Sequence, residues 1–274
     1  MSQGYLLIGL GKKYILENSF LVNTIRKQKD NRPISILVNV EDYEFAKGLN
    51  LFTDIIPYKP VINDPVYKDC TNAFELFCVY IRVNLTRYCL YDETINLDSD
   101  VLCQYSTEKL WNYLSQRPIS VANLGNKIAD ANWHWGQTNN ITRIVNRNIP
   151  SMHCGFNYVR KDEFSSKFFE MARVVFMKYD TYGFKRFFRG ARTEEAVFSL
   201  VYSMLDISPI GYTEYPVMTF NYKKDEVLPT NKQVLLDENN RIVLMEDNIP
   251  FIHMFEKMEG ENFQSLYQQI MGIN

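Results

Sequence analysis

The sequence predicts an α/β fold with a mixed, mostly parallel central sheet flanked by helices and a small β-rich part late in the chain. The first observation is that short apolar runs alternate with helical stretches in the first half of the chain. The second is that two long helices with one apolar face follow, and the third is that the residues after them favour strands. Because the 274 residues contain no recognisable linker, we expect one domain over residues 1–274.

The elements of the first half follow from apolar runs and from apolar residues repeated at helical spacing. The predicted elements are, in order, a strand over 5–10, a helix over 13–29, a strand over 33–40, a strand over 54–57, a helix over 69–86 and a strand over 94–97. The first three make a βαβ unit. In the helix over 69–86, the residues expected to face inward are Phe74, Phe77, Cys78, Ile81 and Leu85.

The second half is predicted from helix caps, apolar faces and one turn. Ser106 and Thr193 can each cap a helix, because a hydroxyl oxygen accepts a backbone N–H of the first turn. Asn239 and Asn240 tolerate positive φ and so predict a turn. The predicted elements are a helix from 106 that buries Leu110, Trp111 and Leu114, a strand over 119–122, an irregular polar segment over 123–150, a helix over 162–179, a helix from 193 that buries Val197, Leu200, Val201, Met204 and Leu205, and hairpin strands over 233–236 and 241–245.

Charge and cysteine content narrow the function class. Lys plus Arg is 30 and Asp plus Glu is 32, so the net charge of −2 argues against nonspecific binding of nucleic acid. No apolar run approaches the roughly 18 residues that cross a bilayer, and the first residues lack a signal-peptide pattern, which predicts a soluble, cytoplasmic protein. Five irregularly spaced cysteines in apolar surroundings are typical of reduced core thiols.

A candidate metal site follows the strand over 94–97. Asp98 and Asp100 emerge at the carboxyl end of that strand, where ligands of such sheets bind. Two carboxylates this close repel each other unless a cation lies between them, and hard oxygen ligands select Mg²⁺ or Mn²⁺. His253 ends a late apolar run, with Lys257 four residues further on, and an added imidazole favours Mn²⁺. A metal held in this way can neutralise a diphosphate leaving group.

These features resemble the nucleotide-sugar-dependent glycosyltransferases of the GT-A fold, particularly the family of glycogenin and the lipopolysaccharide galactosyltransferases (glycosyltransferase family 8). The resemblance implies that Asp98, Ser99 and Asp100 bind the metal and the diphosphate of the sugar donor, with His253 as the third metal ligand. Arg82, sixteen residues before Asp98, matches a basic residue of the family that contacts the donor. The remaining donor contacts that it implies are Gly9, Leu10, Tyr14 and Lys257.

The resemblance also implies catalytic residues, and two tryptophans are candidates for acceptor binding. Glu194 and Glu195 occupy the place of an acidic pair near the reacting sugar carbon. Trp133 and Trp135 are assigned to the acceptor, because exposed indoles stack on a sugar face. The chain departs from the family pattern near Lys257, since no glycine lies between it and His253 and no Pro-Trp follows.

The predicted function is metal-dependent transfer of a sugar from a nucleoside-diphosphate sugar, in the first place a UDP-sugar, to an acceptor hydroxyl. The acceptor classes are a glycan, a lipid, a protein or a modified nucleic acid. The resemblance implies retention of the anomeric configuration, while an inverting enzyme would use Glu194 or Glu195 as its base. Two alternatives remain: a haloacid-dehalogenase-type phosphatase with Asp98 as nucleophile and Asp100 as acid/base, and a noncatalytic module with the same fold.

Overall fold

The computed structural model describes residues 1–133, 136–187, 190–212, 214–215, 217–221, 235–236, 242–243, 249–254, 258 and 260–273. The chain divides into two compact units. The first unit comprises residues 2–58, 95–117 and 212–274, and the second comprises residues 1, 59–94 and 118–211. The division falls within strand β4 (Glu93–Leu97).

The first unit contains the βαβ unit that the sequence predicts. Its elements are β1 (Gln3–Gly9), α1 (Lys12–Lys27), β2 (Ile34–Val38), η1 (Val40–Asp42), α2 (Tyr43–Gly48), β3 (Asp54–Pro57), β5 (Val101–Cys103), α5 (Glu108–Ser115), β11 (Met218–Asn221), β12 (Leu235–Leu236), β13 (Ile242–Val243), β14 (Phe251–Met254) and α9 (Glu261–Met271). Strand β2 pairs in parallel with both β1 and β3. All five residues of β2 are buried, as expected of a parallel strand covered on both faces.

The second unit carries most of the helices of the later chain. Its elements are α3 (Pro65–Asp69), the π-helix η2 (Glu75–Val79), α4 (Tyr80–Arg82), η3 (Leu85–Arg87), β6 (Val121–Asn126), β7 (Asn132–Trp133), β8 (Gly136–Gln137), α6 (Thr138–Val145), β9 (Ser151–Arg160), α7 (Glu163–Met177), η4 (Tyr179–Tyr182), α8 (Glu194–Met204) and β10 (Ile210–Gly211). Strand β6 pairs antiparallel with β9 and parallel with β10. Asp162 caps α7 and Thr193 caps α8, each accepting a backbone N–H of the first turn.

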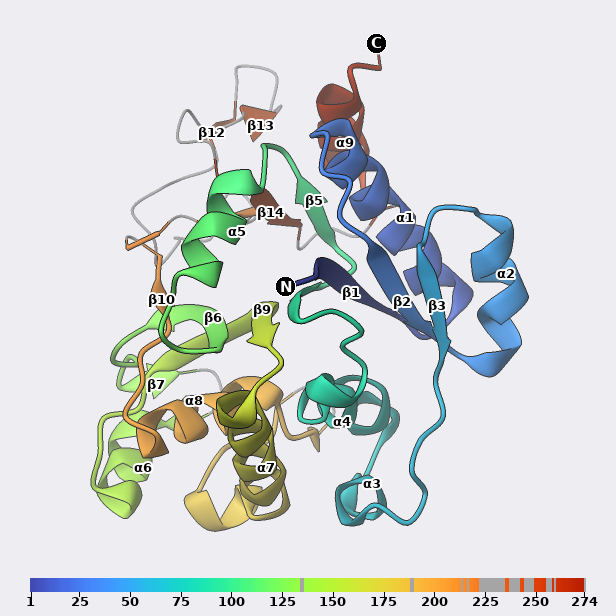
Figure 1. The fold of residues 1–274 in the computed structure, drawn as a ribbon. Helices are drawn as coiled ribbons and strands as arrows, with labels where there is room; N and C mark the ends of the chain where they lie inside the picture. Colours follow the sequence, from blue (N-terminus) through green and yellow to red (C-terminus); the bar gives the residue numbers. More distant parts are fainter. Residues whose placement is uncertain are drawn as a thin grey trace. The chain divides into compact units, whose positions relative to one another are not determined.

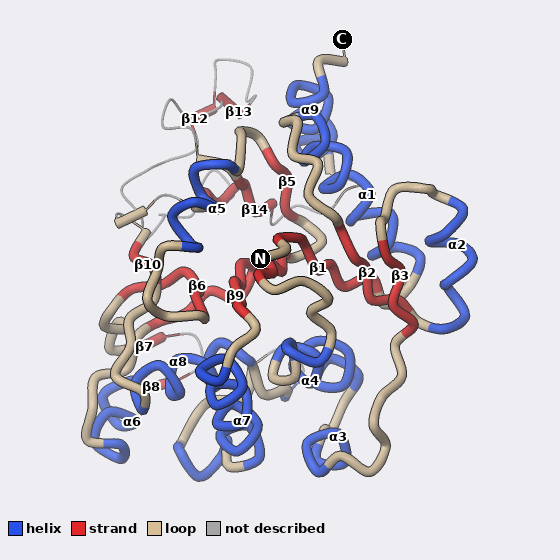
Figure 2. The backbone as a smooth tube through the Cα atoms, in the orientation of Figure 1, coloured by secondary structure: helices blue, strands red, loops and turns tan. Residues whose placement is uncertain are grey.

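The strands form a mixed sheet in the order β10-β6-β9-β4-β1-β2-β3. Figures 1 and 2 show helices following strands along the chain, which is the alternation on which the prediction rested. The fold class, a mixed and mostly parallel sheet flanked by helices, is therefore confirmed.

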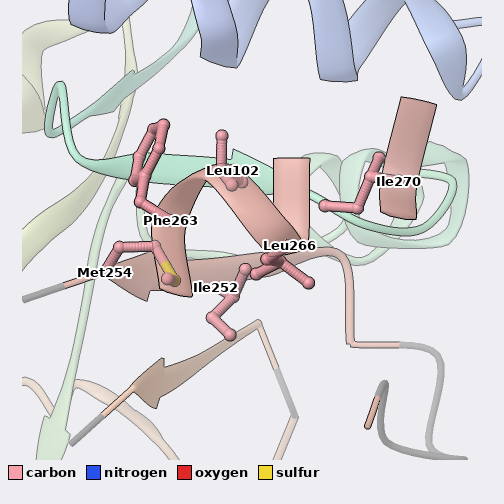
Figure 3. Packing of buried hydrophobic residues seen from close by; sticks show 6 residues of the cluster. All are labelled: Leu102, Ile252, Met254, Phe263, Leu266 and Ile270. Carbon is pink, nitrogen blue, oxygen red and sulfur yellow. The ribbon is translucent and has the colours of Figure 1, made fainter. Parts of the chain in front are cut away.

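The predicted late β-rich part supplies β11 and β14, which form a three-stranded sheet with the earlier β5 in the order β11-β14-β5, but it also contains helix α9, which was not predicted. Helix α9 packs against this sheet (Figure 3), and the shared apolar cluster comprises Leu102, Ile252, Met254, Phe263, Leu266 and Ile270. Fully burying one such side chain contributes about 1.5–3 kcal/mol, so this cluster holds β14 firmly beside β5. Strands β12 and β13 pair antiparallel, which confirms the hairpin for four residues; its turn lies outside the described residues.

The helix predicted over 69–86 is wrong as a continuous helix. Helix α3 ends at Asp69 and a new helical segment starts at Asn72, whose side-chain oxygen accepts the Glu75 backbone N–H at 3.0 Å. The Glu75 carboxylate in turn accepts the Thr71 N–H at 2.8 Å, a reciprocal capping arrangement that starts a helix. The π-helix that follows changes the buried face, so Phe77 is 46% exposed while Glu75 is buried.

The Ser106 cap is present, because Ser106 Oγ accepts the Glu108 backbone N–H at 3.4 Å, while the Thr107 hydroxyl bonds the buried Asp30 carboxylate. Two smaller predictions are wrong. Met204 is 41% exposed because it lies at the end of α8. The polar segment 123–150 is not irregular throughout: it includes the end of β6, the pair β7–β8 and the whole of α6.

Membrane and disulfide features can be assessed within the described part of the chain. None of its helices is both long enough and apolar enough to cross a bilayer. All five cysteines are described and none forms a disulfide, as expected. Cys70 and Cys78 are only half-buried, however, so they are not core thiols like the buried Cys89, Cys103 and Cys154.

Candidate functional site

The structure brings together Asp98, Asp100 and His253, all in the first unit. One donor atom from each lies within 4.8 Å of the other two. His253 Nε2 is 3.4 Å from Asp98 Oδ2 and 3.3 Å from Asp100 Oδ1. The Asp98 side chain is 24% exposed, that of Asp100 is 13% exposed and that of His253 is 7% exposed, so the cluster is open to solvent mainly at Asp98.

Local strand pairing explains why residues 155 positions apart meet. Asp98 follows the wholly buried strand β4, and Asp100 directly precedes β5. Strand β14 runs antiparallel to β5 with His253 opposite Val101, the residue next to Asp100. The Met254 N–H donates to the Asp100 carbonyl at 2.7 Å and continues this pairing into the turn.

The donor set of this cluster fits a divalent cation. Two carboxylates that converge on one point repel each other, and a cation between them removes the repulsion. Two carboxylate oxygens and an imidazole nitrogen suit Mn²⁺ and, with water completing the shell, Mg²⁺. Among the described residues, this is the one group of three or more His, Cys, Asp or Glu side chains with such geometry.

Ser99 is directed to a different partner. Its hydroxyl donates to Glu17 Oε2 at 2.7 Å, and Glu17 lies on α1 with no exposed surface. Glu17 is not among the site residues that the sequence predicts. The available signal was an acidic residue among the inward positions of an amphipathic helix, next to the apolar Ile15 and Leu21.

The predicted nucleotide contacts lie at the junction of β1 and α1, in the same unit. Gly9 ends β1, and a Cβ there would lie 2.8 Å from Ile36 Cδ1 and 3.0 Å from Ile15 Cγ1, so a larger residue would have to displace these two side chains. Gly11 has φ +116°, a conformation that other residues rarely adopt. Tyr14 is 46% exposed in the first turn of α1, and Leu10 is half-buried.

Arg82 and Glu194 form a buried ion pair within the second unit. Arg82 ends α4 and Glu194 begins α8, and their side chains are 10% and 5% exposed. The contact joins Arg82 Nη1 to Glu194 Oε1, with Cys78 Sγ 3.9 Å from the same oxygen. Glu194 Oε2 is buried with no hydrogen-bond partner in the described part of the chain. The two residues, for which the sequence predicts separate roles, therefore form an ion pair with each other.

The remaining predicted site residues are either half-buried or outside the described residues. Glu195 is half-buried, and its backbone N–H donates to Thr193 Oγ1 at 3.3 Å. Trp133 is half-buried in β7, which pairs with β8. Trp135 and Lys257 lie outside the described residues.

Several solved glycosyltransferase structures have a similar fold. The chain matches mouse xyloside xylosyltransferase 1 with a TM-score of 0.56 and 11% identity, over 81% of this chain and 88% of that one. It matches the bifunctional glycosyltransferase WbbM with a TM-score of 0.62 and 12% identity, over 100% of this chain and 49% of that one, so it spans about half of WbbM. It matches the galactosyltransferase LgtC, in complex with donor and acceptor sugar analogs, with a TM-score of 0.55 and 11% identity, over 100% and 95%.

These matches are structural. No protein-family model and no curated protein sequence matches the chain. At 11–12% identity the likeness shows the fold, and it confirms the GT-A fold that the sequence resemblance implies.

Proposed function

We propose that this chain, which has the fold of the GT-A glycosyltransferases, is a metal-dependent glycosyltransferase that uses a nucleoside-diphosphate sugar, with UDP as the nucleotide. The observation that carries the proposal is the convergence of Asp98, Asp100 and His253 at the carboxyl end of β4. In an α/β sheet this is the edge at which ligands bind. The fold of the similar structures supports the same class of reaction.

In this proposal Asp98, Asp100 and His253 hold Mn²⁺ or Mg²⁺. The bound ion supplies a Lewis acid that stabilises the negative charge of the departing diphosphate. The two carboxylates hold the ion, and the His253 imidazole fills a third position from the neighbouring strand. Gly9, Leu10 and Tyr14 are proposed to contact the nucleotide, since they lie where β1 ends and α1 begins.

The transfer breaks the bond from the anomeric carbon to the diphosphate oxygen and forms a bond from that carbon to the acceptor oxygen. With retention, the departing diphosphate oxygen can take the proton of the acceptor hydroxyl, and Glu194 and Glu195 are proposed to lie near the reacting sugar carbon. With inversion, one of the two would take that proton. Arg82 is proposed to orient Glu194 through their ion pair as well as to contact the donor. Lys257 is proposed as a further diphosphate contact.

The acceptor is proposed to contact Trp133 and Trp135, because an indole ring offers a flat apolar face to a sugar. Four classes of acceptor remain candidates: a glycan, a lipid, a protein and a modified nucleic acid. The fold favours this function over a phosphatase that uses Asp98 as nucleophile. The binding experiment below has one result that would favour a noncatalytic module with the same fold.

The donor half of the proposal is tested by ligand-dependent thermal unfolding. We expect UDP with Mn²⁺ to raise the melting temperature, because a ligand at about 100 times its Kd adds about 2.7 kcal/mol of stability. UDP without metal should give a much smaller shift, and Asp98→Asn should lose the metal-dependent part. Glu44→Gln is the matched control, because Glu44 is an exposed carboxylate of the same unit. If no nucleoside diphosphate shifts the wild-type protein in the presence of Mn²⁺, phosphatase substrates are tested next and then the noncatalytic reading.

The stereochemical outcome separates two roles of the acidic pair. We propose retention, as the family resemblance implies, so the product anomer should match that of the donor when the reaction is followed by NMR. A product of the opposite anomer would instead assign Glu194 or Glu195 the role of the base of an inverting enzyme.

A further inference from the structure

Glu17 is a buried carboxylate, and its burial costs free energy that no hydrogen bond within α1 or β1 offsets among the described residues. It is 0% exposed on α1, and its Oε2 accepts the Ser99 hydroxyl hydrogen bond at 2.7 Å. Its other oxygen, Oε1, is buried with no hydrogen-bond partner among the residues that the structure describes. Burying a carboxylate with so few donors costs several kcal/mol, whereas leucine at the same position would carry no such cost.

The neighbouring Asn18 supplies a contact of α1 with β1 that does not involve Glu17. Asn18 Nδ2 donates to the Ile8 carbonyl at 3.0 Å and to the Tyr14 carbonyl at 2.8 Å. The first bond ties α1 to the end of β1, and the second lies within α1. The hydrogen bond of Glu17 leads elsewhere, to the middle residue of the Asp98-Ser99-Asp100 turn.

That turn is anchored at two points within the first unit. The Met254 N–H holds the Asp100 carbonyl at 2.7 Å and so fixes the end of the turn that leads into β5. The Ser99 hydroxyl is held by Glu17, which fixes the residue between the two carboxylates. Because Asp98 and Asp100 flank Ser99 directly, a rotation of the backbone at Ser99 would move both carboxylates relative to His253 Nε2.

We propose that Glu17 is a positioning residue for the metal site: by accepting the Ser99 hydrogen bond, it holds the turn so that both carboxylates converge on His253. The inference rests on the proposed function, because it assigns Asp98, Asp100 and His253 to a divalent cation. Residues that orient metal ligands in this way typically change metal affinity by about 10–100-fold when they are replaced. The hydrogen bond, and not the negative charge of Glu17, is the feature that positions the turn.

The test is a titration of the protein with Mn²⁺ alone, followed by calorimetry or by the electron paramagnetic resonance signal of free Mn²⁺. We expect Glu17→Leu and Ser99→Ala each to weaken Mn²⁺ binding by about 10–100-fold. The double variant should bind Mn²⁺ about as well as the weaker-binding of the two single variants, because both substitutions remove the same Ser99–Glu17 hydrogen bond. Glu17→Gln and Ser99→Thr should stay close to the wild type, because a Gln carbonyl oxygen still accepts and a Thr hydroxyl still donates.

Thermal unfolding without metal accompanies each titration, so that loss of folding is not mistaken for loss of binding. Glu17→Leu replaces a buried carboxylate by an apolar side chain and is expected to fold at least as stably as the wild type. A merely structural Glu17 would change stability and leave the Mn²⁺ affinity of the folded variants unchanged, which would overturn the proposal. If Glu17→Gln binds Mn²⁺ as weakly as Glu17→Leu does, the effect comes from the charge of Glu17, and this result would also overturn the proposal.

Asp98→Asn in the same titration separates this inference from the proposed function. If the wild type binds Mn²⁺ no better than Asp98→Asn, the metal site itself is wrong and the role of Glu17 falls with it. If the wild type binds and Asp98→Asn does not, while Glu17→Leu and Ser99→Ala bind like the wild type, the proposed metal site stands and only the positioning role is wrong.

Discussion

Asp100→Asn is expected to lower the metal-dependent transfer rate by at least about 10³-fold while the protein remains folded. The substitution keeps the shape of the side chain but removes the charge of one of the two carboxylates assigned to the cation. Stabilisation of developing charge is the largest single contribution in many active sites, and losing one such group typically costs about 10²–10³-fold in kcat. Loss of an ion that itself stabilises the diphosphate should exceed that.

The measurement is the initial rate of UDP release from a panel of UDP-sugars, with water and with sugar acceptors, at several Mn²⁺ concentrations. Glu44→Gln serves again as the exposed carboxylate-to-amide control and should keep the wild-type rate. Thermal unfolding of Asp100→Asn without metal should match or exceed that of the wild type, because one of two repelling carboxylates is neutral. A wild-type rate and metal dependence in Asp100→Asn would contradict the assignment of this cluster to catalysis.

Arg82→Leu is expected to destabilise the protein by about 3–5 kcal/mol, because it leaves the Glu194 carboxylate buried without its cation. Both side chains are at most a tenth exposed, so water can screen the remaining charge only weakly. The double variant Arg82→Leu with Glu194→Leu should recover most of this loss, since a buried ion pair replaced by apolar residues is often neutral or stabilising.

Urea unfolding measures this effect through the midpoint and slope of the transition. Lys47→Met is the matched control: it breaks a pair with Glu44 whose side chains are 63% and 80% exposed, which contributes little. A loss below about 1 kcal/mol for Arg82→Leu would mean that Glu194 finds another partner or reaches solvent. Because the two residues are so closely paired, activity data on either variant are to be interpreted only together with this stability measurement.

The elements that the sequence predicts well are those determined by local pattern. The buried runs of β1 and β2 and the amphipathic face of α7 follow from neighbouring residues, and the structure confirms them. The helix over 69–86 could not be predicted in the same way. Its interruption depends on Glu75, which is bonded by Arg192 from 117 positions away as well as by Thr71.

In the candidate site, too, the residues marked by a local sequence pattern could be predicted, and their long-range contacts could not. The turn with Asp98 and Asp100 is a local signal at the end of an apolar strand, and His253 was added from a separate motif. The hydrogen bond of Ser99 to Glu17 spans 82 positions and the pair of Arg82 with Glu194 spans 112, so neither leaves a spacing in the sequence. Pairings of this kind are fixed by tertiary packing and not by periodicity.

The position of His253 in the chain has a consequence for biosynthesis. Strand β14 and helix α9, which packs on it, leave the ribosome long after the turn that carries Asp98 and Asp100. A nascent chain therefore contains Asp98 and Asp100 before the third ligand, His253, has been made. The cluster is completed only when the last described strand pairs with β5, so a chain that stalls before residue 253 displays the acidic turn without the histidine. A metal-sensitive probe on ribosome-bound chains of increasing length would report the length at which the cluster is completed.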